Sequence, residues 1–108
     1  MPSSTIARGN SLSTFYIAPS LTPTSVLTAI TAVQTFTVPG LLTTDIVNVI
    51  GFNGSQTAGI IIAEADCLAN NVLTIQFGNV TGGTLTPAAG VYTIQVVRAE
   101  GPLPVTAV

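Results

Sequence analysis

Residues 73–77 read Leu-Thr-Ile-Gln-Phe, and residues 92–96 read Tyr-Thr-Ile-Gln-Val. In both stretches apolar side chains alternate with polar ones, which is typical of a strand with one face on a core and the other in solvent. The rest of the chain also suits strands, because 39 of its 108 residues are Thr, Val or Ile. Their β-branched side chains pack well on a pleated sheet. The sequence therefore predicts an all-β fold.

Two predicted turns lie between strands. Residues 35–38 alternate polar with apolar side chains and are followed by Pro39-Gly40, a pair suited to the central positions of a type II turn. Asn70-Asn71 predicts a second turn, because Asn tolerates the left-handed backbone conformation and hydrogen-bonds to its own backbone. Both turns separate segments of a length that is usual for strands.

The alternation also predicts which side chains form the core. In the strand expected at residues 45–51, Ile46 and Ile50 share a face with Asn48, and we expect this face to point inward. Residues 57–65 are expected to form a strand that is apolar on both faces. The expected core consists of Phe36, Val38, Ile46, Ile50, Leu73, Ile75, Phe77, Tyr92, Ile94 and Val96.

The spacing of the strands predicts the architecture. Short strands at intervals of about 8–12 residues are typical of a sandwich rather than of βαβ units. Residues 11–17 are expected to form a strand, and residues 25–33 fit a strand or one short helical turn, of which we favour the strand. We expect a single-domain antiparallel β-sandwich, jelly-roll-like, at residues 25–100. An extended N-terminal arm at 1–24 and a C-terminal tail at 101–108 flank it.

The N-terminal arm is the candidate partner-binding segment. Its apolar residues are irregularly spaced and interrupted by prolines, so we do not expect them to form a core of their own. We expect the arm to cross a neighbouring subunit, with Phe15 or Tyr16 anchored in an apolar pocket and Arg8 near a carboxylate or carbonyl cluster. The candidate partner-binding residues are Arg8, Leu12, Phe15, Tyr16 and Ile17.

Charge is scarce throughout the chain, which has two Arg, four acidic residues and no Lys or His. An ordinary soluble chain carries roughly 25% charged residues, and small domains generally rely on them to remain single in solution. We therefore expect an assembly component and a homo-oligomer. A net charge of −2 argues against nucleic acid as a partner, since phosphates are bound by clustered cations.

The ionisable residues offer little for catalysis. Without His or Lys the chain lacks the commonest general base and metal ligand and the amine of Schiff-base chemistry. Glu64 and Asp66 are spaced like a possible glycosidase pair, but their place beside Asn70-Asn71 is more typical of a solvated edge. We expect no enzyme activity, no cofactor and no metal, and we expect Cys67 to be a small buried hydrophobe. The acidic residues expected at the surface are Asp45, Glu64, Asp66 and Glu100.

The apolar residues indicate neither a membrane protein nor a secreted one. No run approaches the roughly 20 apolar residues of a spanning helix, and residues 1–8 contain no apolar core of a signal peptide. Phe15, Tyr16 and Tyr92 could form a sugar-stacking platform. Tyr92, however, is in phase with Ile94 and is expected in the core.

Four segments of the chain carry a resemblance to a known group of proteins. They are residues 34–41, Gln-Thr-Phe-Thr-Val-Pro-Gly-Leu; residues 45–49, Asp-Ile-Val-Asn-Val; and residues 73–81 and 85–92. Over residues 30–98 the chain resembles small threonine-rich proteins encoded in tailed-bacteriophage genomes. These include capsid decoration or cement proteins with jelly-roll or related β-sandwich folds. The shared motifs are strand-and-turn patterns rather than catalytic signatures.

The resemblance implies a structural role. Cement proteins bind the outer face of a capsid lattice, often at two-fold or three-fold positions, and brace neighbouring subunits of the major capsid protein against internal pressure. It implies synthesis in the host cytoplasm and a place on the outer surface of the virion. Two alternatives are a tail, neck or fibre-associated structural protein, and a carbohydrate-binding adhesin displayed on the virion.

The scarcity of charge predicts how association responds to salt. Self-association and capsid binding should change little between low and high ionic strength, because salt screens charges and not apolar or backbone contacts. Sedimentation at two salt concentrations measures this. A weakening of about ten-fold or more at high salt would show that charge steers the contact, and would place Arg8 and Arg98 at its centre.

Overall fold

The computed structural model describes residues 10–106, which form antiparallel strands and no helix. The strands are β1 (Ser11–Ile17), β2 (Ser20–Leu21), β3 (Thr31–Thr37), β4 (Asp45–Phe52), β5 (Ile60–Ala69), β6 (Val72–Asn79) and β7 (Gly90–Ala99). The predicted all-β class is confirmed. Within this described stretch there is no helix that could cross a membrane.

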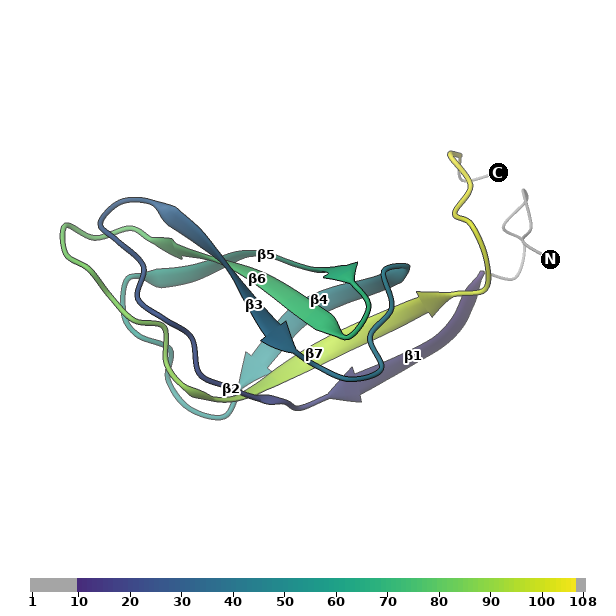
Figure 1. The fold of residues 1–108 in the computed structure, drawn as a ribbon, viewed down its shortest axis with the longest axis horizontal. Helices are drawn as coiled ribbons and strands as arrows, with labels where there is room; N and C mark the ends of the chain where they lie inside the picture. Colours follow the sequence, from purple (N-terminus) through teal and green to yellow (C-terminus); the bar gives the residue numbers. More distant parts are fainter. Residues whose placement is uncertain (1–9, 107–108) are drawn as a thin grey trace.

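The strands form two sheets that lie face to face (Figure 1). In the first sheet β7 is central, with β4 on one edge and β1 followed by β2 on the other. The second sheet has the order β3-β6-β5. All pairs are antiparallel, as expected for a β-sandwich. Among residues 10–106 the sheets have four and three strands, which differs from the eight strands of a jelly roll.

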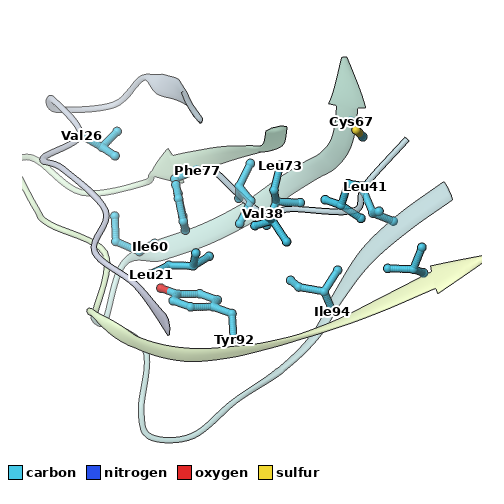
Figure 2. Close-up of a cluster of buried hydrophobic side chains, with 13 residues drawn as sticks. Leu21, Val26, Val38, Leu41, Ile60, Cys67, Leu73, Phe77, Tyr92 and Ile94 are labelled. Atoms are coloured by element: carbon cyan, nitrogen blue, oxygen red, sulfur yellow. The ribbon is translucent and has the colours of Figure 1, made fainter. Parts of the chain in front are cut away.

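The core lies between the inner faces of β6 and β7, as Figure 2 shows. β6 contributes Leu73, Ile75 and Phe77 to this core, and β7 contributes Tyr92, Ile94 and Val96. All six of these side chains are fully buried. Burying a side chain of this size stabilises a fold by about 1.5–3 kcal/mol. The predicted inward faces of both strands are confirmed.

The predicted register of β4 is wrong by one residue. Ile46 is 44% exposed and Ile50 is 52% exposed, whereas Val47 is buried and Val49 packs against the core. Asn48 lies between the two isoleucines on the same face, and a buried carboxamide without partners is costly. The strand therefore turns its two valines inward and leaves the face that contains Asn48 in solvent.

The two predicted turns are confirmed and are bound to each other. Gly40 has a φ of 95°, and Asn71 has a φ of 68°, so both adopt the left-handed conformation that their sequences favour. The Asn71 Oδ1 atom accepts the Gly40 N–H at 2.8 Å, and the Asn71 carbonyl accepts the Val38 N–H at 2.9 Å. These bonds tie the β3–β4 turn to the β5–β6 turn. Val38 is buried, as expected, and Phe36 packs partly buried against the core.

Two other predicted strands have different bounds in the structure. The segment expected at residues 25–33 contributes an isolated bridge between Val26 and Leu85, and β3 begins only at Thr31. The strand expected at residues 57–65 begins at Ile60 and continues to Ala69 as β5. Its edge position leaves two of its isoleucines, Ile61 and Ile62, largely in solvent.

The expected N-terminal arm is in large part a strand of the domain itself. Residues 11–17 form β1 as predicted, but β1 pairs with β7 of the same chain rather than crossing to a neighbour. β2 extends the same edge, so residues 11–21 belong to the first sheet. Arg8 and the rest of residues 1–9 lie outside the described residues.

The corrected register of β4 can be tested by making the same change, Ile to Ala, in two separate variants. Ile94→Ala removes a fully buried side chain and should lower the free energy of unfolding by about 2–5 kcal/mol. Ile46→Ala removes the same atoms from the outer face and should change it by about 0.5 kcal/mol or less. Chemical denaturation measures both. A large loss for Ile46→Ala would restore the register predicted from the sequence.

Candidate partner-binding surface

Arg98 and Asp45 form a bidentate ion pair within the first sheet. The Nε and Nη2 atoms of Arg98 donate to Oδ1 and Oδ2 of Asp45, both at 2.8 Å. The Asp45 side chain is completely buried, and the Arg98 side chain is 27% exposed. The two residues stand opposite each other in the β4–β7 pairing. The ion pair therefore fastens the beginning of β4 to the end of β7.

The same pair binds two further elements. Nη2 of Arg98 also donates to the Gly40 carbonyl at 3.0 Å, and the Leu42 N–H donates to Oδ2 of Asp45 at 3.0 Å. The guanidinium carbon lies 5.1 Å from the centre of the Phe15 ring, which is a cation–π contact. The β3–β4 turn and β1 are thus held by one guanidinium. The expectation that Asp45 lies at the surface is wrong, because its carboxylate is fully paired inside the protein.

The ion pair shifts the pKa of both groups. Hydrogen bonding from Arg98 holds the pKa of Asp45 below its ordinary 3.8 and outweighs the opposing effect of burial. The hydrogen bonds to Asp45 in turn raise the pKa of Arg98. Asp45 is therefore an anion at neutral pH, and its charge is satisfied within the sheet.

The candidate partner-binding residues divide between the two sides of β1. Leu12 and Tyr16 are 67% and 62% exposed, whereas Phe15 and Ile17 are partly buried against the core. Phe15 therefore serves the domain itself, which corrects its expected role as an anchor in a neighbour. Leu12 and Tyr16 are exposed on β1, which lies at one edge of the first sheet (Figure 1).

The outer face of the first sheet carries no charged side chain on its three long strands. We call it the neutral face, and it consists of Thr14, Tyr16, Ile46, Asn48, Ile50, Thr93, Gln95 and Val97. The pairing register aligns these side chains in rows across the strands, among them Tyr16, Gln95 and Asn48 in one row. The face combines exposed aliphatic groups, one aromatic ring and carboxamides on three hydrogen-bonded strands.

A hollow adjoins the neutral face where β4 begins and β7 ends. Its volume is about 590 Å³, and its lining consists of Thr43, Thr44, Asp45, Ile46, Ala99, Gly101, Pro102 and Leu103. The one carboxylate in this lining, that of Asp45, is already paired with Arg98. The hollow therefore offers a mainly uncharged recess beside Ile46.

The outer face of the second sheet differs in carrying two acids. Glu64 is paired in register with Gln76, and Asp66 with Thr74, so the two carboxylates share this face of β5. Hydrogen bonding to Asp66, together with repulsion from its charge, raises the pKa of Glu64 above its ordinary 4.5. Glu64 is exposed and Asp66 is half-buried. Residues 10–106 hold no group of three or more His, Cys, Asp or Glu side chains that could bind a metal.

The three aromatic residues of the possible sugar platform do not lie together. Tyr92 is fully buried, and its hydroxyl donates to the Ala88 carbonyl and accepts from Gln56 Nε2 at 2.9 Å. Burial raises the pKa of Tyr92 above 10.0. Phe15 is turned inward under Arg98, so only Tyr16 presents an open ring. Cys67 is buried as expected, with its thiol donating to the Ala69 carbonyl at 3.1 Å.

Comparisons with protein-family models, curated proteins and solved structures gave no match to this chain. The surface must therefore be interpreted from its own geometry. The neutral face and the exposed side of β1 form one continuous region, because Thr14 and Tyr16 belong to both.

The buried ion pair can be tested against the exposed acid of the other sheet. Asp45→Asn should lower the free energy of unfolding by about 3 kcal/mol, since removing one partner of a buried pair typically costs about 3–5 kcal/mol and Arg98 keeps some contact with water. Glu64→Gln makes the same chemical change on an exposed side chain and should be nearly neutral. Denaturation at pH 7 measures both. Equal effects would mean that the Asp45 carboxylate has no special structural role.

The lowered pKa of Asp45 also predicts the pH dependence of this difference. Because the pKa of Asp45 is lower in the folded protein than in the unfolded chain, where it is near 3.8, the ionised carboxylate stabilises the fold at any pH above 3.8. This stabilisation is lost as the pH falls through the pKa of Asp45 in the folded protein. The wild type and Asp45→Asn should therefore converge in stability below about pH 4. A difference that stays constant from pH 7 into this acid range would contradict the assignment.

Proposed function

We propose that this protein is a structural virion protein that decorates the capsid of a tailed bacteriophage and braces its major capsid protein subunits. The observation that carries the proposal is the neutral face, an uncharged sheet surface with Tyr16, Ile46 and Ile50 exposed on it. The resemblance of residues 30–98 to decoration proteins agrees with it. A domain so poor in charge is expected to bury part of its surface against other subunits.

The neutral face suits binding to a large protein surface. Apolar area removed from water contributes about 25 cal/mol per Å², and the carboxamides of Asn48 and Gln95 supply hydrogen bonds without the desolvation of a charge. The Arg98–Asp45 pair beneath the sheet links β4 to β7, and strands held in place before binding lose less conformational entropy on binding.

Decoration stabilises a shell by thermodynamic linkage. A protein that binds the assembled lattice, but not its separated subunits, shifts the equilibrium towards the lattice by mass action. A subunit that touches two neighbouring capsid subunits adds a multivalent gain at each position. Chemistry at a catalytic site is not needed for this role.

A tail, neck or fibre position would use the same surface. A displayed carbohydrate-binding adhesin is a second candidate, favoured by the row of Tyr16, Gln95 and Asn48. An exposed ring beside carboxamides is a common arrangement for stacking on a sugar and bonding its hydroxyls.

The location of the protein on particles tests the proposal. Purified virions of the phage that encodes the chain should contain it, and gold-labelled antibody should mark their heads. Label confined to tails or necks would support the alternative structural position, and particles without the protein would contradict a virion role. Particles that lack the protein should also release their DNA at a lower temperature when they are heated.

A pair of variants tests the binding face. Ile46→Asp places a charge on the neutral face and should reduce decoration of undecorated heads at least about ten-fold, because the new charge must be desolvated on binding. Ile61→Asp makes the same change on the other sheet, where Ile61 is 51% exposed, and should bind normally. Loss of binding with Ile61→Asp alone would assign the interface to the second sheet.

A further inference from the structure

We propose that the open edge of β1 pairs with β1 of a second copy of this chain, antiparallel and about a two-fold axis at Thr14. This pairing would join the first sheets of two copies into one continuous sheet. The contact is separate from binding of the neutral face to a shell, and it holds whether or not the proposed virion role is correct.

Within residues 10–106, the backbone of β1 is paired with β7 on one side only. Residues of an antiparallel pair alternate between those that bond the neighbouring strand and those that point away from it. The Pro19 carbonyl accepts the Tyr92 N–H at 3.0 Å, and the register is unbroken from Pro19 back to Ser13. By this alternation Thr14 and Tyr16 direct their N–H and C=O groups away from β7 and towards the open edge.

β1 is less protected than the edge strands of the second sheet. In β5 the outer face carries Glu64 and Asp66, and the pairing is broken by two register shifts, whereas β1 has a single shift, close to its beginning, between Ser11 and Ser13. At the β3 edge, Gln34 Oε1 accepts the Thr24 N–H and Gln34 Nε2 donates to the Thr24 carbonyl, both at 2.8 Å. These bonds hold the chain around Thr24 beside β3. β1 contains no charge and no proline between Ser11 and Ile17, and charges and prolines are the usual guards of an exposed edge.

The length of β1 selects the register. A two-fold axis at Thr14, the middle residue of seven, places the seven residues of β1 opposite those of the copy and leaves the register shift between Ser11 and Ser13 at the two ends of the pair. An axis nearer Tyr16 would bring Pro19, which has no N–H, into the paired region. The Thr14 register places Leu12 of one copy opposite Tyr16 of the other, so the two most exposed apolar side chains of β1 cover each other. Aliphatic–aromatic pairs of this kind stabilise antiparallel strands.

Electrostatics do not oppose this pairing of identical strands. The nearest charge in register is Arg98, which stands opposite Ser13. Its guanidinium is engaged by the Asp45 carboxylate and covered by the Phe15 ring. Two copies therefore meet without like charges facing each other, and the association should be insensitive to salt.

Cysteine trapping tests both the contact and its register. Thr14→Cys should be linked between copies by a short thiol-reactive crosslinker in high yield, since paired residues of adjacent strands lie about 5.5 Å apart at Cα. Tyr16→Cys should be linked poorly on its own, because the two copies of this position are four residues apart along the pair, roughly 13–14 Å. A mixture of Leu12→Cys and Tyr16→Cys should give the mixed dimer.

The control is Thr35→Cys, which places an exposed thiol on the opposite edge strand, β3. It should not be linked between copies by the crosslinker, and neither should the wild type, whose Cys67 is buried. Sedimentation of the wild type over a concentration series should show a dimer that Thr14→Pro abolishes, since this change removes an outward N–H. Crosslinking of Thr35→Cys or Tyr16→Cys above that of Thr14→Cys, or a monomer at every concentration, would overturn the proposal.

Discussion

The packing of β7 against β6 is the contact on which the rest of the structure depends. β7 supplies three fully buried side chains to the core and is also the strand to which β1, β2 and β4 are bonded. A domain of this size has one modest core, and here its centre is the contact between two strands. Removing that contact would leave the first sheet without a second layer to cover its apolar face.

The domain has few charged side chains, and two of them, Arg98 and Asp45, bind each other inside the fold. Arg98 joins β7, β4, the β3–β4 turn and β1 through one guanidinium, and Asp45 satisfies it from inside the sheet. The pair therefore contributes to the fold and adds no charge to the neutral face above it. The neutral face is therefore suited to partners that bind through apolar and amide groups. This agrees with the proposed role in an assembly.

β1 belongs both to the fold and to the proposed interfaces. Its inward residues, Phe15 and Ile17, close one side of the core, while Leu12 and Tyr16 are left in solvent. A strand of this kind presents backbone bonding groups on its free edge and side chains on its free face. Two different contacts, with another copy and with a shell, can therefore use the same seven residues from different directions.

The sequence by itself determined the features that depend on neighbouring residues. The alternation at residues 73–77 and 92–96 established two strands and their inward faces, and Gly40 and Asn71 established the turns. The orientation of β4 was not determined in this way, because both of its faces contain aliphatic side chains. The tertiary structure decided it through two polar residues: Asp45 points inward because Arg98, 53 residues away along the chain, pairs with it, and Asn48 on the opposite face stays in solvent. It also decided that β1 pairs with β7. These strands are far apart in the sequence, and the pattern of residues within a strand does not indicate which other strand it will pair with.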